Sequence, residues 1–586
     1  MNGEWSLDAL YLGFDDPKYQ ADRVRLTALC AALNDLSGRL SDLEPAQALH
    51  QVLSLQEELR QLSTLLMGYS SLRQSTNSRD ADAVSNMGQL QAELSSVSGA
   101  NAAFEAYVAA LPDLEPLLAA DPFLADYRYL LESIRRDSRY LLPAREEEIL
   151  SRMNISGGSA WSQQQGHLTS AVEVDFRGGK TNLSAIRNMA YDPDPALRRE
   201  AYEAELACYP KIADAVAFSL NSIKLQVIQE CQLRGYDSPL DQTLQSARME
   251  RRTLDALLSA MNDYLPRFWE YLRVKARVLG HEGGLPWYDL FAPMGENSRK
   301  FTIESARDYL LHVFASFDGQ LHDMAAQAFD EHWIDFYPHD GKRGGAFCSG
   351  LQPIRQSRIL TNFDGSFSDV VTLAHELGHA FHNVNLYDHR PLNKSYSMPV
   401  AETASNFNEC IVNGYAIRHA RSDAEKLALI ESQLSDTTQI ICDILSRYLF
   451  ETAVFDQRAS RFMDSQALCG IMLNAQKQAY GDGLDHSLLH PYMWVCKSHY
   501  YSTGRSFYNF PYAFGGLFAR GLYAQYEEEG SAFVPKYKTL LHTTSVASVE
   551  DTAKIAGLDL TDKAFWARGL ESYAQMIDQF IALAQK

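Results

Sequence analysis

Apolar residues recur at spacings of three and four along most of the chain, a pattern that predicts a mainly α-helical protein. Ser366, with Asp369 three residues later, is a capping-box signature and predicts where one of these helices begins. A second helix is expected from Met398 onward, with Pro399 in its first turn. The clearest apolar stripe, in the first of these two helices, consists of Leu373, Leu377, Phe381 and Val384.

The first 110 residues show the same periodicity. Long amphipathic helices are expected over 21–36, 46–69 and 80–111, with a serine-rich link at 70–79. Their packing as an internal helical bundle is favoured over a coiled-coil surface for a partner. The fold class expected is therefore mainly α.

Three segments interrupt the helical pattern with alternating apolar and polar positions. A loop at 157–159 and a short strand over 169–176 are expected first. Residues 346–349 and 358–363 then predict two strands of a small sheet beside the two helices that begin near Ser366 and Met398. Its exposed edge would hold an extended peptide by backbone hydrogen bonds, with Gly345 and Ala346 at the point of close approach.

The stretch His375-Glu376-Leu-Gly-His379 has the spacing of a metal site. Residues four apart lie on one face of a helix, so His375 and His379 can bind one metal ion. Glu376 lies beside that ion, free to take a proton from a metal-activated water. A chance placement of histidines on a helix is the alternative, because so short a pattern also arises without function.

A catalytic metal usually takes three protein ligands. Glu402, on the polar face of the second helix, is the natural third ligand. Glu409, two turns further along the same face, is expected to accept the other ring N–H of a ligand histidine. An ordinary solvated face explains Glu409 equally well.

Several motifs in the same order resemble the thimet oligopeptidase superfamily, and within it the oligoendopeptidase F branch. They run from Gly341–Cys348 and Ile359–Phe363 through the histidine motif to Glu402-x-x-Ser405. The resemblance implies a zinc endopeptidase that holds one Zn²⁺ per chain and acts on short peptides. It also implies a large helical fold split by a deep substrate channel. The expected segments are 1–110 (N-terminal helices), 111–195 (a cleft wall like the oligoendopeptidase F N-terminal domain) and 196–586 (the catalytic domain).

The segment 499–516 is rich in aromatic residues. His499 and Tyr508 resemble the His and Tyr that the family presents to the substrate carbonyl, and Tyr512 resembles a further family tyrosine. We expect Gly504, Gly515 and Gly516 to let this segment close over bound peptide. His486 and His490 have no metal-like partners in the sequence and are expected at the surface.

Composition narrows the function further. The net charge of −21 argues against a general nucleic-acid binder, which needs a basic face. No signal peptide or membrane-spanning stretch is visible, which favours a cytoplasmic protein.

Eight cysteines without a C-x-x-C pair suggest reduced, buried residues. For Cys348, near the expected cleft, a packing role is favoured over a reactive thiol. The oligomeric state stays open.

Two alternatives remain from the sequence alone. A zinc carboxypeptidase on a similar helical fold could use the same motif, with Arg505 gripping a free C-terminal carboxylate. The chain could also be a catalytically inactive peptide-binding scaffold, although every catalytic residue type is present.

Overall fold

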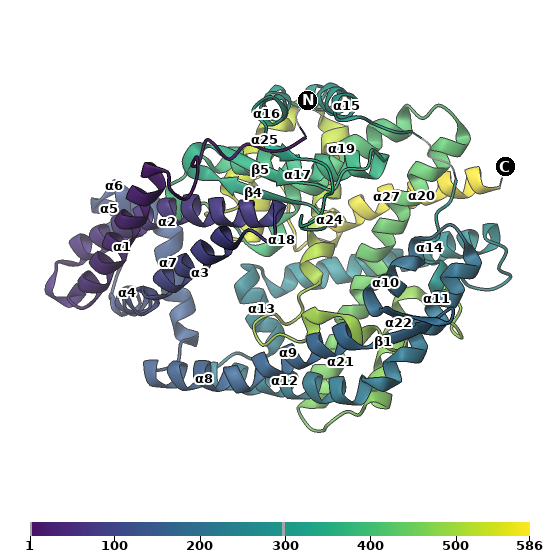
Figure 1. Ribbon diagram of the computed structural model, residues 1–586, viewed down its shortest axis with the longest axis horizontal. Helices are drawn as coiled ribbons and strands as arrows, with labels where there is room; N and C mark the ends of the chain where they lie inside the picture. Colours follow the sequence, from purple (N-terminus) through teal and green to yellow (C-terminus); the bar gives the residue numbers. More distant parts are fainter. Residues whose placement is uncertain (1–2, 296–298, 586) are drawn as a thin grey trace.

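The computed structural model describes residues 3–295 and 299–585, and helices dominate it (Figure 1). The N-terminal helices gather at the left of the figure, and α8, α9 and α12 run along its lower edge. The first thirteen helices are α1 Pro17–Ser37, α2 Pro45–Thr76, α3 Ala81–Ser95, α4 Ser98–Ala110, α5 Glu115–Ala120, α6 Pro122–Asp126, α7 Arg128–Asp137, α8 Ala144–Ser156, α9 Gly158–Ala171, α10 Leu183–Asn188, α11 Pro195–Cys208, α12 Ala213–Arg234 and α13 Pro239–Ala247.

The remaining helices include α17 and α19, close together near the top of Figure 1, and α21 and α22, which lie in its lower half near α12. They are α14 Arg251–Val278, α15 Ile303–Ala315, α16 Gly319–Asp330, α17 Phe367–Leu386, α18 Met398–Ala401, α19 Thr403–Arg418, α20 Asp423–Thr438, α21 Ile444–Arg458, α22 Ser465–Tyr480, α23 Met493–Cys496, α24 Phe510–Glu529, α25 Val534–Thr543, α26 Val549–Ile555 and α27 Lys563–Ala584. The mainly α fold class is confirmed.

Two small sheets accompany the helices. β1 (Glu173–Phe176) and β2 (Gly179–Asn182) form an antiparallel hairpin. β3 (Ile334–Asp335), β4 (Phe347–Leu351) and β5 (Gln356–Leu360) form the second sheet in the order β3-β5-β4. The predicted small sheet is therefore present, and β4 is one of its edge strands.

Several predicted boundaries are wrong. The helix expected over 80–111 is two helices, because the chain breaks between α3 and α4, and α2 continues to Thr76 through the expected serine-rich link. The residues expected to form a loop at 157–159 largely begin α9. That helix extends to Ala171, so the expected strand over 169–176 shrinks to β1. In α2 and α9 the helical hydrogen bonds continue through residues whose local preference is for turns or strands.

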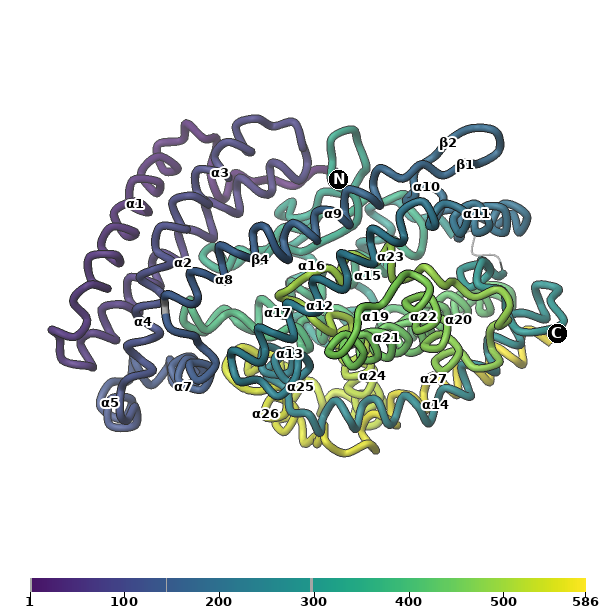
Figure 2. The backbone as a smooth tube through the Cα atoms, turned by 90° about the horizontal axis from the view of Figure 1, so that it is seen from below, coloured from purple at the N-terminus to yellow at the C-terminus, as the bar shows by residue number. Residues whose placement is uncertain are grey.

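Apolar side chains collect in three cores. One is built almost wholly from the N-terminal helices, between Leu10 and Leu131. A second joins residues 172–223 to residues 450–501, and the third and largest contains the metal-motif helix α17. In Figure 2, α9 and α12 run side by side across the molecule. Within the described ranges, no helix combines the length and apolar content that a bilayer crossing requires. The expected segment boundaries stay predictions.

Candidate metal centre and active site

Helices α17 and α19 approach so closely that a side chain at Gly378 would collide with the facing backbone. A Cβ built there would lie 2.5 Å from the Ala404 carbonyl oxygen and from Ser405 Cα. The predicted capping box is present, since Ser366 and Asp369 each accept a hydrogen bond from the other's backbone N–H. α17 is thus fixed at its start, and the glycine between the two histidines brings it against α19.

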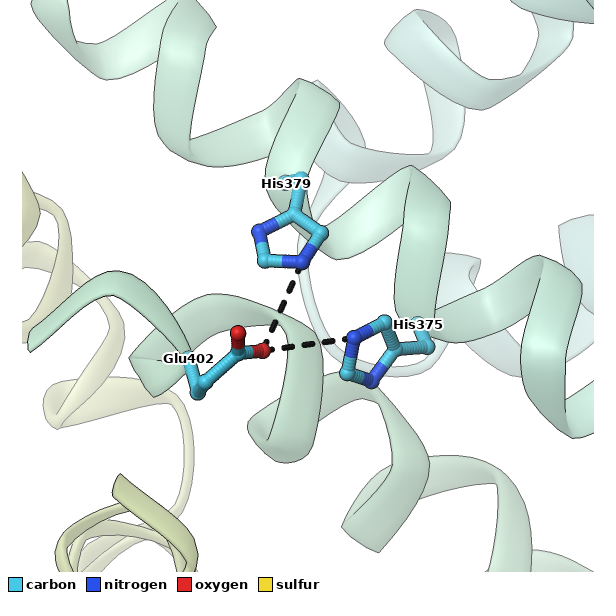
Figure 3. Close-up of side chains that lie close together, drawn as sticks. All are labelled: His375, His379 and Glu402. Carbon is cyan, nitrogen blue, oxygen red and sulfur yellow. Dashed lines mark ion pairs between the residues drawn. The ribbon is translucent and has the colours of Figure 1, made fainter. Parts of the chain in front are cut away.

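His375, His379 and Glu402 converge on one point (Figure 3). Glu402 Oε2 lies 3.3 Å from His375 Nε2 and 3.4 Å from His379 Nε2. The expected second helix is in fact broken at Glu402, which has φ −91° and ψ 7° between α18 and α19. The Ser405 hydroxyl donates a hydrogen bond of 2.8 Å to the same oxygen, Oε2.

Glu409 fixes the orientation of the first histidine. Its Oε1 lies 2.5 Å from His375 Nδ1, which leaves Nε2 to face Glu402. The side-chain amide of Asn408 donates to the Ala374 carbonyl oxygen at 3.1 Å and ties the two helices together beside this pair.

The protein groups alone shift the pKa values of all three cluster residues. Burial would lower the pKa of His375, but its hydrogen bonds to Glu402 and Glu409 outweigh burial and raise it to about 10. Burial would raise the pKa of Glu402, yet the His375 hydrogen bond and the two histidine charges lower it to about 2. Burial and the charge of His375 lower the pKa of His379 to about 4. A metal ion bound here would therefore replace a proton that His375 carries.

Glu376 is buried beside the cluster, with 5% of its surface exposed. Its Oε2 has no hydrogen-bond partner among the described residues. Burial, reinforced by the Glu402 and Glu409 carboxylates, raises the pKa of Glu376 to about 7. Such a carboxyl can exchange a proton near neutral pH.

A pocket of about 560 Å³ opens at the cluster. It is lined by both histidines, Glu376, Glu402 and residues of β4. Ala346, which directly precedes β4, lines it too. Gly345 is not among its lining residues, and its carbonyl oxygen accepts a 2.8 Å hydrogen bond from the Asn362 amide. Cys348 also lines the pocket, and because burial raises its pKa its thiol stays protonated, as a packing role requires.

The resemblance also suggested His499, Tyr508 and Tyr512 as site residues. Tyr508 contacts the other two, but none of the three lines this pocket. The His499 and Tyr508 rings have centroids 6.1 Å apart, and the Tyr508 and Tyr512 hydroxyls are 3.0 Å apart. Burial raises the pKa of Tyr512, and the Glu402 carboxylate raises it further. Burial and the charge of Arg447 lower the pKa of His499 to about 3, so its ring is neutral.

The expectation of a mobile segment through Gly515 and Gly516 is not borne out by their positions. Both lie buried within α24, where a Cβ at Gly515 would come within 3.0 Å of Glu402 Cβ. They permit close packing. Gly504 is different, because a Cβ there would meet nothing within 4 Å.

Two residues of α21 hold the neighbours of Tyr508 in place, and the sequence did not reveal either contact. Phe507 has the unusual φ of 51° and packs its ring against Phe455, with centroids 5.5 Å apart. Asn509 Oδ1 accepts a hydrogen bond of 3.0 Å from Arg447. Tyr508 therefore sits between two anchored neighbours. The π-helical turn Gln439–Asp443 just before α21 is a further local irregularity of the kind found near functional sites, and no sequence pattern marks it.

The prediction that His490 lies at the surface is wrong. It is fully buried, with Nε2 3.0 Å from Glu205 Oε1. Its partner is 285 residues away in the chain, so no local pattern could indicate the pair. His486 is exposed, as predicted.

A buried carboxylate beside a His-His-Glu cluster, in a pocket that a β-strand also lines, suits metal-assisted hydrolysis of a peptide bond. A family model for Peptidase family M3 matches residues 188–572, and one for Oligopeptidase F matches residues 112–173. The chain belongs to Peptidase family M3, and it is a metallopeptidase that hydrolyses peptides.

Relatives of known name agree with this assignment. Oligopeptidase PepF of Bacillus subtilis is 23% identical over 78% of this chain and 69% of its own length. Group B oligopeptidase PepB of Streptococcus agalactiae is 23% identical over 87% of this chain and 85% of its own. Among solved structures, a protein of Chlamydophila abortus has a TM-score of 0.85 at 20% identity, covering 99% of this chain and 98% of its own. Oligoendopeptidase-F from Enterococcus faecium has a TM-score of 0.72 at 18% identity, covering 97% and 99%. These structures share the fold.

Proposed function

We propose that the chain is a zinc-dependent oligoendopeptidase that cleaves internal bonds of short peptides. The observation that carries the proposal is the convergence of His375, His379 and Glu402 with the buried, unpartnered oxygen of Glu376 beside them.

The donor set fits zinc. Two imidazole nitrogens and one carboxylate oxygen are donors that catalytic zinc sites use, and the three ligand atoms lie within 4.8 Å of one another. The distances from Glu402 Oε2 to the two histidine nitrogens are 3.3 and 3.4 Å. When bound, the ion supplies Lewis-acid chemistry, lowering the pKa of a water and polarising a carbonyl.

Glu376 moves the proton. Its carboxylate would accept a proton from the attacking water and then deliver it to the leaving amine nitrogen. The absence of any hydrogen-bond partner for Oε2 among the described residues leaves that oxygen available for this exchange. β4, as an edge strand, would hold the peptide backbone in extended form across the pocket.

Tyr508, Tyr512 and His499 are the candidate groups that stabilise the oxyanion. The hydroxyls of Tyr508 and Tyr512 lie 3.0 Å apart, so the two phenols would act together. A single donor of this kind typically contributes about 10²–10³ in rate.

A carboxypeptidase remains the second candidate because of Arg505. It is exposed, makes no ion pair within the described part of the chain, and lies 5.6 Å from the Tyr508 ring centroid. A guanidinium in that position could bind a free C-terminal carboxylate.

An internally quenched peptide blocked at both ends separates the two candidates. We expect the zinc-loaded chain to cleave it at an internal bond, and Glu376→Gln to retain zinc while losing nearly all turnover. His379→Ala should lose zinc instead, as metal analysis after gel filtration would show. Cleavage only of peptides with a free carboxyl end would favour the carboxypeptidase. A zinc-loaded Glu376→Gln with near-normal rate would reject the assignment of the base.

A further inference from the structure

A second cavity, of about 180 Å³, lies apart from the metal pocket and shares none of its lining residues. Its wall comes from α10 and α11, from the turn around Trp287, from the π-helical turn before α21, and from the end of α23. The charged residues in the wall are Arg187, Arg198, Glu205, Asp443 and Lys497.

Four of these charges have partners. Arg187 pairs with Glu205 at 2.5 Å, and Arg198 pairs with Asp289 at 2.8 Å, both through side-chain atoms. Asp443 pairs with Arg447. The ammonium group of Lys497 has neither an ion pair nor a hydrogen bond to any residue that the structure describes.

The cavity therefore has a surplus positive charge. Burial and the neighbouring Arg447 lower the pKa of Lys497, and the Asp443 carboxylate, which is paired with Arg447, only partly offsets them. Enclosed lysine side chains are rarely left without a counter-ion. A small anion from outside the chain would supply one.

The other walls favour an anion that carries an apolar group. Tyr191 and Phe291 form one side with ring centroids 4.7 Å apart, and Trp287 forms another. The side-chain amides of Asn188 and Gln439 also line the cavity and make no hydrogen bond within the described residues. The volume suits one amino-acid residue better than a long peptide.

We propose that this cavity binds the C-terminal residue of a peptide, with the carboxylate on Lys497 and the side chain against Tyr191, Phe291 and Trp287. The inference rests on the proposed function in one respect, namely that peptides are the molecules that reach this cavity. Binding here requires neither Glu376 nor a metal ion.

Calorimetric titration of the Glu376→Gln chain with N-acetyl-L-phenylalanine, and with its C-terminal amide, tests the proposal without turnover. We expect the acid to bind at least tenfold more tightly than the amide. Lys497→Met should weaken acid binding at least tenfold, whereas Lys497→Arg should stay within about threefold of the parent. Lys477→Met, at an exposed lysine on α22, is the matched control and should bind as the parent does.

Removing the metal with a chelator separates this cavity from a carboxylate bound at the metal centre. Binding that persists without metal supports the cavity, and binding lost with the metal overturns it. Equal affinity for acid and amide, or undiminished binding by Lys497→Met, would also overturn it. If acetate binds as tightly as N-acetyl-L-phenylalanine, the aromatic residues do not contribute to binding, and that part of the proposal is rejected. None of these outcomes depends on whether the chain cleaves peptides.

Discussion

At the residue scale, Glu409 contributes through the histidine that it orients. Its carboxylate holds His375 Nδ1 at 2.5 Å, so the ring presents Nε2 to the metal position. We expect Glu409→Ala to weaken metal affinity about 10- to 100-fold, because the ring loses its orientation and its partner's charge. Competition with a chromogenic chelator measures the change. Glu409→Gln, which can still accept a hydrogen bond, should lie between parent and Ala; an unchanged affinity in Glu409→Ala would contradict the role.

Most individual metal-site residues could be predicted from the sequence, because helical geometry alone places His375 and His379 together. Glu402 needed the further assumption that the next helix returns antiparallel. Arg447, Asn509 and the Glu205–His490 pair could not be predicted, since each depends on a contact between segments far apart in the chain.

At the scale of elements, the spacing between α17 and α19 sets the ligand distances. A Cβ at Gly378 would meet backbone atoms at 2.5 Å, which no side-chain rotation relieves. We expect Gly378→Ala to lower stability by about 1–3 kcal/mol and to weaken zinc binding, because the helices must separate. Thermal unfolding with metal analysis tests this. Gly88→Ala in α3, where a Cβ meets nothing within 4 Å, is the control and should be neutral or slightly stabilising.

A second prediction at this scale concerns the hold of α21 on Tyr508. Arg447 contacts Asn509 and Asp443 through two different guanidinium nitrogens, a fixed fork that the single nitrogen of a lysine does not reproduce. We expect Arg447→Lys to lower kcat about tenfold or more, with little change in KM or zinc content. If Arg447 acts by positioning Tyr508, adding Arg447→Lys to Tyr508→Phe should cost almost nothing more. Independent, multiplying losses would show that Arg447 acts by another route.

The elements also show where local patterns fail. The apolar stripe of α17 predicted a helix correctly, because its packing and its cap agree with its propensity. The break at Glu402 had no such signal. It arises where a ligand side chain must turn toward the histidines while α24 packs against it through Gly515. Gly515 and Gly516 suggested flexibility in the sequence, yet the structure uses them for close packing.

At the scale of the whole molecule, the core that joins residues 172–223 to 450–501 packs against a polar group in which Glu205 contacts Arg187, Tyr209 and His490. All four are buried except Arg187, which is partly exposed. Burial would raise the pKa of Glu205, but His490 and Arg187 outweigh it and lower the pKa from 4.5 to about 2. A carboxyl with a lowered folded-state pKa stabilises the fold above its unfolded pKa, and that contribution disappears as pH falls through the folded value. The relevant window therefore lies between about pH 4.5 and pH 2.

We expect Glu205→Gln to melt at a lower temperature than the parent at pH 6, because the charges of its partners lose their counter-ion. The difference in Tm should shrink steadily as the pH is lowered from 5 toward 3, since the unfolded parent then binds a proton at Glu205 that the folded parent does not. Calorimetric scans of both chains at matched pH measure it. Glu200, like Glu205, lies on α11, and it forms an exposed ion pair with Arg177. Glu200→Gln is therefore the control, and its Tm should differ little from that of the parent at any of these pH values. A Tm difference for Glu205→Gln that stays constant over this range would mean that the carboxylate charge does not hold the two segments together.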